Sequence, residues 1–396
     1  MTKLSILLLT TGVNPAIGGP FESVSGLARG FSKDPFTNVT VVGCASRNVD
    51  WESHRERWGA ASLSVHQGSR FKRLAKARRY LMDRIARDSI EIVHASGLWD
   101  ETTLLARWVI GRSTLPLVWS IRGMLEPWAL AYRRPRKVVA WAALQRASLT
   151  AANVIHATAD SEARSCRRAG LRQPIAVVPN GIDVHPLPIA ADDRHSNRLG
   201  RCGYLGRLHP KKGLPNLIEA WRHCDTRRWE LVIAGPDSGG HAALLKSLAR
   251  HHGLANVHIV EPVYGEDRTR FLEQCDLFVC PSFSENFGNA IAEAMERGKP
   301  VITTTGTPWS VLSHEHIGWW VDPEPSALAR GLADALQADP HQLNVMGSRC
   351  REHVVNTYSW PVVVRQMRAV YEWLLGGDAP GWLYLGERAA RFERQA

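Results

Sequence analysis

The stretch LFVCPSFSENFGNAIAEAMERG, residues 277–298, carries three successive local signals. Residues 277–282 form a short apolar run, which is typical of a strand buried inside a sheet. A polar turn follows, and residues 288–297 then place apolar side chains at helical spacing and end at Gly298, a frequent helix terminator. A buried strand that leads through a loop into a helix is the repeating unit of parallel sheets, so this stretch predicts an α/β fold.

The same alternation extends in both directions along the chain. Further strands are predicted at 4–9, 38–44, 91–96, 115–121, 153–158, 175–180, 201–206, 230–235, 257–262, 300–305 and 318–323. Further helices are predicted at 21–32, 71–88, 101–111, 126–146, 160–169, 213–223, 240–253, 266–274 and 360–375. This order predicts doubly wound, Rossmann-like parallel sheets with helices on both faces.

The chain of 396 residues favours two domains over one. The polar segment PIAADDRHSNRLG, residues 188–200, interrupts the alternation and is predicted to be a linker. We therefore expect an N-terminal domain over 1–187, a C-terminal domain over 201–359, and a tail over 379–396 that carries no clear signal. Ligands of such sheets bind beyond the carboxyl ends of the strands, so a site is expected in the cleft between the two domains.

Composition narrows the class of protein. With 44% hydrophobic and 22% charged residues the chain is expected to be soluble and globular, and no apolar stretch is long enough to cross a bilayer. The short apolar run near the N-terminus lacks a signal-peptide cleavage site.

Seven scattered cysteines indicate reduced thiols in a cytoplasm, without a disulfide framework or a zinc site. A net charge of +11 favours an anionic partner, which could be nucleic acid, a phosphorylated ligand or an acidic membrane.

Two carboxylates flank the start of the helix predicted after residue 287. Glu285 precedes the helix and Glu293 lies within it. Each carboxylate can accept hydrogen bonds from two hydroxyls, as a sugar or a ribose would offer, and the amides of Phe287, Gly288 and Asn289 would suit a phosphate between them. Either acid alone could also have an ordinary role without a ligand. Glu293 would then be an early-helix acid favoured by the helix dipole, and Glu285 a solvated loop residue.

Two cations follow the first strand of the second domain. In GYLGRLHPKKG, residues 203–213, the strand ends at Gly206, and Arg207 and Lys212 lie in the following loop. They would stand near Glu285 and could neutralise a diphosphate. The chain has no Asp-x-Asp motif, so we expect these cations and the helix N-terminus to replace a metal ion. The alternative is that both are surface charges, as Lys211 is expected to be.

Several motifs together resemble one known family. They are GGP (18–20), IVHASGLW (92–99), VVPNGID (177–183), GYLGRL (203–208) with KKG (211–213), CDLFVCPSFSENFGNAIAEAM (275–295) and GKPVITT (298–304). In this combination the chain, from about residue 4 to about residue 375, resembles the retaining nucleotide-sugar glycosyltransferases of family 4, which have the two-domain GT-B fold. The segments SIRGMLEPWAL (120–130), GTPW (306–309) and GWWVDP (318–323) resemble members that build bacterial exopolysaccharide or the O-antigen of lipopolysaccharide.

The resemblance implies a role for each matching position. Glu285 would hold hydroxyls of the donor sugar, and Glu293 would bind the ribose. Arg207 and Lys212 would neutralise the diphosphate. The other implied donor-binding residues are Gly18, Gly19, Asn286, Phe287, Gly288 and Asn289. The last helix, within 360–378, would pack back on the N-terminal domain, and no cofactor or metal is expected beside the donor.

The acceptor side departs from the family pattern. Arg122 stands where many relatives have a histidine, Ser96 replaces a second histidine, and GTPWS (306–310) replaces the usual Gly-x-Pro-Glu segment. His94, Trp99 and Arg122 are expected to contact the acceptor, although His94 could equally be a core histidine with satisfied nitrogens.

The resemblance also implies retention of anomeric configuration. We expect front-face attack through an oxocarbenium-like transition state, with Glu285 positioning the sugar instead of acting as a nucleophile. The segments 71–88 and 126–146 combine basic residues with apolar or aromatic ones, which favours an anionic membrane and a lipid-diphosphate-linked acceptor. The protein is then expected to be cytoplasmic or peripheral on the inner membrane. The alternative is ordinary helices that bury one face on the sheet.

Four other functions compete with this interpretation. A hydrolysing sugar-nucleotide epimerase would share the fold and the phosphate cations, and a non-catalytic sugar-binding relative would share every donor-side residue. Nucleic-acid binding would explain the charge but leaves the 284–295 segment without a purpose, and no nucleic-acid motif is present. A dehydrogenase is disfavoured because no Gly-x-Gly-x-x-Gly follows the first strand.

Overall fold

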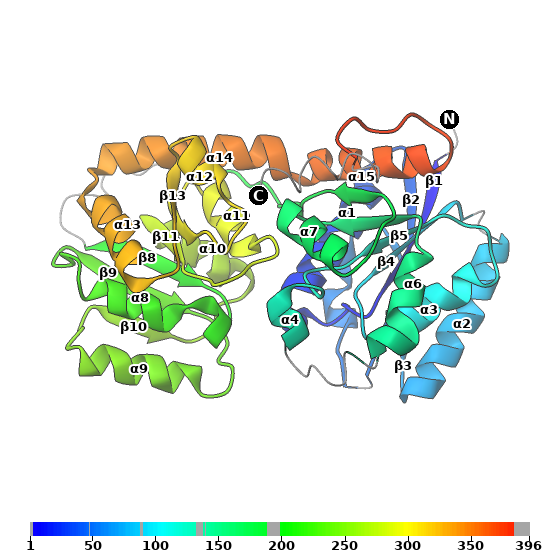
Figure 1. The fold of residues 1–396 in the computed structure, drawn as a ribbon, viewed down its shortest axis with the longest axis horizontal. Helices are drawn as coiled ribbons and strands as arrows, with labels where there is room; N and C mark the ends of the chain where they lie inside the picture. Colours follow the sequence, from blue (N-terminus) through cyan, green and yellow to red (C-terminus); the bar gives the residue numbers. More distant parts are fainter. Residues whose placement is uncertain are drawn as a thin grey trace. The chain divides into compact units, whose positions relative to one another are not determined.

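The computed structural model describes residues 3–46, 48–87, 90–131, 138, 140–187 and 199–383. The chain divides into two compact units (Figure 1). The N-terminal unit contains the residues up to Gly181 together with those from Trp360, and the C-terminal unit is Ile182–Ser359. Most of the predicted linker, 188–200, and most of the predicted tail, 379–396, lie outside the described residues.

The N-terminal unit is built on one parallel sheet. Its strands are β1 (Leu4–Thr10), β2 (Thr37–Ala45), β3 (Ser62–Gln67), β4 (Ile92–Ser96), β5 (Leu117–Ser120), β6 (Val154–Ala157) and β7 (Ile175–Val177). Its helices are α1 (Gly19–Lys33), α2 (Arg70–Arg87), α3 (Glu101–Ile110), α4 (Pro127–Ala131), α6 (Arg146–Thr150), α7 (Asp160–Arg168) and α15 (Trp360–Leu374). The strand order β3-β2-β1-β4-β5-β6-β7 is that of a doubly wound sheet.

The C-terminal unit repeats this arrangement. Its strands are β8 (Gly200–Leu205), β9 (Trp229–Ala234), β10 (Val257–Val260), β11 (Leu277–Cys280), β12 (Val301–Thr304) and β13 (Gly318–Val321). Its helices are α8 (Leu214–Trp221), α9 (His241–His251), α10 (Gly265–Gln274), α11 (Asn289–Glu296), α12 (Val311–His314), α13 (Pro325–Gln337) and α14 (Pro340–Tyr358). All pairings in the order β10-β9-β8-β11-β12-β13 are parallel, so the predicted fold class is confirmed.

Strand β1 shows why its run ILLL, residues 6–9, is apolar at every position. Ile6 and Leu8 point to a core shared with α1 and α15, whereas Leu7 and Leu9 point to a core shared with α2 and α3. Successive side chains of a strand alternate between faces, and helices cover both faces here.

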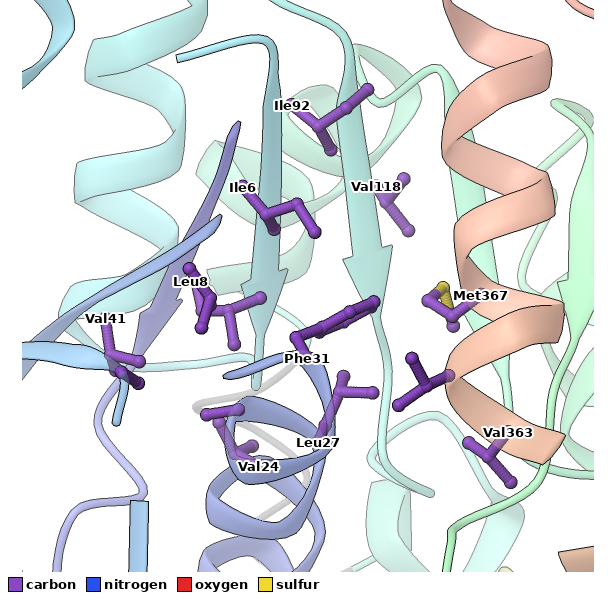
Figure 2. Packing of buried hydrophobic residues seen from close by; sticks show 14 of the residues in the cluster. Ile6, Leu8, Val24, Leu27, Phe31, Val41, Ile92, Val118, Val363 and Met367 are labelled. Carbon is purple, nitrogen blue, oxygen red and sulfur yellow. The ribbon is translucent and has the colours of Figure 1, made fainter. Parts of the chain in front are cut away.

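Helix α15 completes the first of these cores. Figure 2 shows Val363 and Met367 of α15 facing Leu27 and Phe31 of α1, with Leu8 of the sheet beside them. A segment from the end of the chain therefore belongs to the core of the N-terminal unit.

Four labelled elements were not predicted, namely β3, α12, α13 and α14. The predicted helix 126–146 is described only in part: α4, a π-helical turn at Trp141–Gln145, and the start of α6. Among the described helices, none has the length and low charge that crossing a bilayer requires. All seven cysteines are free thiols, and burial raises the pKa of Cys44 to about 12.

Candidate functional site

The order of the strands places two loops of the C-terminal unit side by side. Strands β8 and β11 are neighbours, with Cys202 opposite Leu277 and Gly203 opposite Phe278. They are the pair at which a doubly wound sheet reverses its winding, where ligands of such sheets bind beyond the carboxyl ends. The loop after β8 carries Arg207 and Lys212, and the loop after β11 carries Glu285.

Hydrogen bonds from outside the loop hold the segment between β11 and α11. The amide of Phe283 donates to the carbonyl of Lys211 at 2.9 Å, and that of Glu285 donates to the carbonyl of Gly306 at 2.9 Å. The indole of Trp309 donates to the carbonyl of Phe287 at 2.5 Å. These bonds fix the loop to both neighbouring loops, so Glu285 is held by a defined backbone.

Lys212 and Glu285 form an ion pair in this loop region. The Lys212 ammonium donates to Oε1 of Glu285, and the buried Ser282 hydroxyl donates to the same oxygen at 2.6 Å. The two charged side chains are only 19% and 13% exposed, respectively. Within the described part of the chain, Oε2 of Glu285 accepts no hydrogen bond and the Lys212 ammonium makes no second one, so the pair retains capacity to bind a ligand.

The pair remains ionised over a wide pH range. Burial opposes the charge on Glu285, but the attraction of Lys212 and the two hydrogen bonds outweigh it and lower the pKa of the carboxyl. Burial likewise opposes the charge on Lys212, and the Glu285 carboxylate outweighs it and raises the pKa of the ammonium. At neutral pH the site therefore presents a carboxylate and an ammonium together.

Arg207 adds a second cation. Its side chain is exposed and makes no hydrogen bond or ion pair with the described residues. Its charge acts against protonation of Lys212 and, after burial, is the largest influence that lowers the pKa of His209. A cation that is unpaired and lies beside another favours an anionic ligand.

Two glycines shape these loops. Gly213 follows Lys212 at φ 64°, and a Cβ there would lie 2.1 Å from the carbonyl oxygen of Pro281. Gly288 precedes α11 at φ 87°, and a Cβ there would lie 3.0 Å from Ile291. Only glycine permits this backbone without strain. Helix α11 starts without a side-chain cap, so its N-terminal end, at Gly288 and Asn289, keeps a positive potential.

Glu293 has a partner that the sequence did not indicate. Arg268 of α10 donates to Oε2 of Glu293 through Nε at 2.6 Å, and its Nη2 lies 2.6 Å from the same oxygen. The predicted contact of Glu293 with a ribose stays a prediction, and it would be made by a carboxylate that Arg268 already orients. Asn286 and Phe287 lie in the loop just before α11.

The predicted residues of the N-terminal unit lie after β1, β4 and β5. Gly18 and Gly19 lie at the start of α1, and a Cβ on either would meet no atom within 4 Å. Trp99 follows β4 and adopts φ 70°, and its ring lies 6.2 Å from that of Trp141. Arg122 follows β5 and adopts φ 57°. The basic run at 132–137 lies outside the described residues.

His94 lies in the core, as the alternative interpretation has it. Its side chain is 1% exposed, its Nε2 lies 2.6 Å from the Ser120 hydroxyl, and its Nδ1 lies 2.5 Å from the Tyr371 hydroxyl of α15. With both nitrogens bonded and almost no exposed surface, His94 has no free nitrogen to offer an acceptor in this structure.

The bonds of His94 continue into a chain. Ser120 also lies 2.6 Å from Nδ1 of His156, and Nε2 of His156 lies 2.8 Å from the carbonyl of Val178. Since a carbonyl only accepts, His156 must donate to it, and the donors then run from Tyr371 through His94 and Ser120 to His156. Burial lowers the pKa of His156 to about 3 and that of His94 well below its usual value, so both are neutral.

Sequence analysis missed three residues that hold these sites: Ser282, Arg268, and Glu162 of α7, whose carboxylate accepts a hydrogen bond from the amide of Gly123 in the turn after β5. The position of Ser282 at the end of the predicted strand 277–282 was an available signal. Arg268 and Glu162 lie on helices among other charged residues, and no local pattern distinguishes them. Among the described residues, no three side chains form a group that could hold a metal ion.

Comparisons with known proteins match each unit separately. A model described as Glycosyltransferase Family 4 matches residues 17–186, and a model described as Glycosyl transferases group 1 matches residues 197–353. Together they span most of the chain.

Two relatives illustrate the match. The chain is 30% identical over 173 residues to the protein named Uncharacterized glycosyltransferase MJ1607, of Methanocaldococcus jannaschii, covering 43% of this chain and 44% of that protein. It is 26% identical over 377 residues to the GDP-mannose:cellobiosyl-diphosphopolyprenol alpha-mannosyltransferase of Xanthomonas campestris, covering 92% and 95%. The chain thus spans less than half the length of the first relative and nearly all of the second.

A solved structure shares the architecture. Anabaena Alr3699/HepE, crystallised in complex with UDP and glucose, superposes with a TM-score of 0.72 at 19% identity, over 93% of this chain and 99% of that one. At this identity the likeness concerns the fold. The two family matches show that the chain belongs to glycosyltransferase family 4, and the shared architecture shows that it has the GT-B fold.

Proposed function

We propose that the protein is a retaining glycosyltransferase that moves a sugar from a nucleotide-diphosphate sugar to a glycan acceptor carried on a lipid diphosphate. The observation that supports this most is the Lys212–Glu285 pair at the reversal point of the second sheet. It offers one carboxylate oxygen to a sugar hydroxyl and two ammonium hydrogens to phosphate oxygens.

The chain's own residues suffice to describe the transfer. Oε2 of Glu285 accepts a hydrogen bond from a hydroxyl of the donor sugar. This bond fixes the orientation of the sugar ring. Lys212 and Arg207 bind the diphosphate and stabilise the charge that develops as the bond between the anomeric carbon and the phosphate oxygen breaks. The acceptor oxygen bonds to that carbon from the same face, and its proton passes to the departing phosphate oxygen. The configuration is therefore retained.

We further propose that the reaction needs no metal ion. Two cations and the N-terminal end of α11 supply positive charge where a divalent ion would otherwise neutralise the diphosphate. A chelator should then leave the rate unchanged, whereas loss of activity that only a divalent metal restores would contradict this point.

The relatives indicate which substrates to test first. The Xanthomonas campestris relative is named for GDP-mannose as donor and a cellobiosyl-diphosphopolyprenol as acceptor. The Anabaena structure contains UDP and glucose. We propose that the donor is a nucleotide-diphosphate sugar and that the acceptor is a glycan on a lipid diphosphate. We also propose a role in the biosynthesis of bacterial surface polysaccharide.

We propose that α2 binds the anionic cytoplasmic face of the inner membrane, as an acceptor on a lipid requires. Ala77 and Leu81 bury one side of the helix, while Phe71 is 87% and Met82 is 59% exposed. Its cationic residues are Arg70, Lys72, Arg73, Lys76, Arg78, Arg79, Arg84 and Arg87. Exposed apolar side chains on a basic helix favour an anionic bilayer.

Vesicle sedimentation tests the membrane proposal. The protein should sediment with phosphatidylglycerol vesicles and stay in solution with phosphatidylcholine vesicles, and Phe71→Asp should weaken the binding. Retention by the neutral vesicles alone would count against it.

A transfer assay tests the reaction. The protein is incubated with a panel of nucleotide sugars, each with and without a cellobiosyl-diphosphate lipid, and the anomeric configuration of the product is determined by NMR. We expect a new α- or β-linkage that matches the donor, and Glu285→Gln should lower turnover while the Michaelis constant for the donor stays similar. An equal release of free sugar or an epimer without acceptor would indicate the hydrolysing epimerase, and no product from any donor would favour a sugar-binding protein.

A further inference from the structure

Arg122 occupies a backbone position that arginine disfavours. The amide of Met124 donates to the carbonyl of Ile121 at 3.3 Å, which closes a turn around Arg122 and Gly123. Both central residues have positive φ, 57° and 71°, as in a type I′ turn. Glycine, asparagine and aspartate are the usual residues at the first of these positions. A long cation at such a position is typical of sites where strain serves a ligand.

A buried carboxylate holds this turn in place. Glu162 of α7 is 0% exposed. Its Oε1 accepts the amide of Gly123, and its Oε2 accepts the amide of Thr158 at 2.6 Å and the Thr158 hydroxyl at 3.1 Å. Glu162 thus ties the turn after β5 to the loop after β6, and both of its oxygens are engaged by groups other than Arg122.

The guanidinium of Arg122 is bound by neutral groups alone. Its Nε donates to the Ser96 hydroxyl at 3.3 Å, and its Nη1 donates to Oδ1 of Asn180 at 2.5 Å. In the described part of the chain, Nη2 donates to no acceptor and no carboxylate forms an ion pair with this group. Burial lowers the pKa of Arg122 to about 10, so the side chain stays charged at neutral pH. The Glu162 carboxylate attracts this guanidinium without forming an ion pair with it, so Nη2 retains capacity to bind an anion.

A second strained residue lies at the same edge of the sheet. Among the described residues other than glycine, positive φ occurs at Trp99, Arg122 and His316. Trp99 follows β4, the strand next to β5, so two of the three lie after neighbouring strands of the N-terminal sheet. Strain concentrated at one edge supports a binding site there.

We propose that Arg122 binds an anionic oxygen group, a phosphate or a carboxylate, of the acceptor substrate, with Glu162 as its positioning residue. This inference rests on the proposed transfer reaction, in which the C-terminal unit holds the donor and leaves the acceptor to the N-terminal unit. Nη2 donates to the anion, while Ser96 and Asn180 keep the guanidinium in its orientation. The same chemistry could also belong to the diphosphate of the donor, so the experiment separates the two sources.

The first measurement is calorimetric titration with inorganic pyrophosphate, in a Lys212→Gln background that weakens the donor-side cations. Arg122→Asn removes the charge but suits positive φ, and Arg112→Asn, at an exposed arginine of the same unit, is the matched control. We expect Arg122→Asn to weaken binding by about 10- to 100-fold, the usual effect of a charged hydrogen bond, and the control to leave it unchanged. Equal binding by Arg122→Asn and the control overturns the proposal.

The second measurement locates the anion in the substrates. Transfer rates are compared for a cellobiosyl-diphosphate lipid and for the uncharged octyl cellobioside. We expect Arg122→Asn to raise the Michaelis constant for the charged acceptor by about 10- to 100-fold and to leave those for the uncharged acceptor and the nucleotide sugar unchanged. A rise for the nucleotide sugar instead would assign the anion to the donor and overturn the acceptor assignment. If the unmodified protein transfers no sugar, the proposed function fails, and the pyrophosphate titration still decides the role of Arg122.

Two further variants separate positioning from folding. Glu162→Gln should weaken pyrophosphate binding although Arg122 is present, and Arg122→Lys should restore part of the affinity that Arg122→Asn loses. Thermal unfolding of each variant identifies any loss caused by misfolding. Full affinity in a folded Glu162→Gln variant would remove the positioning role of Glu162.

Discussion

The two units of this protein share one winding order of strands but bury different chemistry. In the C-terminal unit, Lys212 and Glu285 meet as charged partners with spare hydrogen-bonding capacity. In the N-terminal unit, Tyr371, His94, Ser120 and His156 form a neutral chain in which each nitrogen and hydroxyl has a partner. The scaffold fixes where side chains meet, and the local partners decide whether they bind a ligand or hold the fold.

The electrostatic origin of this difference is the presence or absence of a counter-charge. Glu285 keeps its charge despite burial because Lys212 lies against it. His94 and His156 have no carboxylate in their chain, and Arg122 lies near, so burial keeps both neutral. The same burial therefore produces an ionised site in one unit and an uncharged one in the other.

The largest expected effect comes from Lys212. Lys212→Gln should lower the turnover number by about 10²–10³, the usual result of removing one group that stabilises a developing negative charge. The measurement is steady-state kinetics with the donor identified by the transfer assay. Lys211→Gln, one residue away, is the control and should stay within about twofold, since Glu285 is bonded by Lys212. Equal losses of turnover in the two variants would mean that catalysis depends on the net positive charge of the loop and not on the Lys212–Glu285 ion pair.

The next effect is on folding of the N-terminal unit. Glu162→Ala should lower the free energy of unfolding by about 3 kcal/mol, because it leaves the amide of half-buried Gly123 and that of buried Thr158 without an acceptor. Urea denaturation followed by tryptophan fluorescence measures it. Glu266→Ala, which removes an exposed carboxylate paired with Arg270, should change stability by less than about 0.5 kcal/mol. A similar cost for both variants would contradict the importance of the buried bonds.

The dependence of stability on pH should distinguish the neutral histidine chain from the Lys212–Glu285 ion pair. An unfolded histidine takes up a proton below about pH 6.5, whereas folded His156 stays neutral down to about pH 3. Stability should therefore fall with decreasing pH in this window, by up to about 1.4 kcal/mol per pH unit for each such histidine.

The ion pair should not respond to pH between 7 and 5. The pKa of Glu285 is lowered from 4.5, so its stabilisation is complete above that pH and is lost only at lower pH. The pKa of Lys212 is raised above 10.5, so its stabilisation is lost only above that pH.

Denaturation of His156→Asn, measured from pH 7 to pH 5, tests the histidine effect. Its free energy of unfolding should fall less steeply with decreasing pH than that of the unmodified protein. An unchanged slope would assign the acid sensitivity elsewhere.

The smallest effect concerns the contact between α15 and the sheet. Tyr371→Phe should lower the free energy of unfolding by about 1 kcal/mol, because Nδ1 of His94 loses its donor. Tyr80→Phe in α2 is the control, since its hydroxyl has no hydrogen bond to the described residues, and it should not change stability. Thermal unfolding of the pair provides the comparison, and a neutral Tyr371→Phe would mean that packing alone holds α15.

Much of the fold follows from local patterns. Buried parallel strands are apolar on both faces, so runs such as 4–9 and 277–282 were recognised without knowledge of their neighbours. Strand β3, SLSVHQ, pairs only with β2 at the edge of its sheet and carries polar residues, which weakened its pattern. Helix α14 had an available signal, the capping box formed by Asp339 and Gln342, which was overlooked.

The sequence by itself determined the α/β class and the residue types near the site, because these depend on composition and spacing over short distances, and its motifs carried the resemblance to the family. The tertiary structure alone decided which side chains meet. Lys212 and Glu285 are 73 residues apart, and His94 and Tyr371 are 277 apart. Such pairs depend on the order in which strands assemble and on the helix that packs over them, and no local pattern of a chain encodes that order.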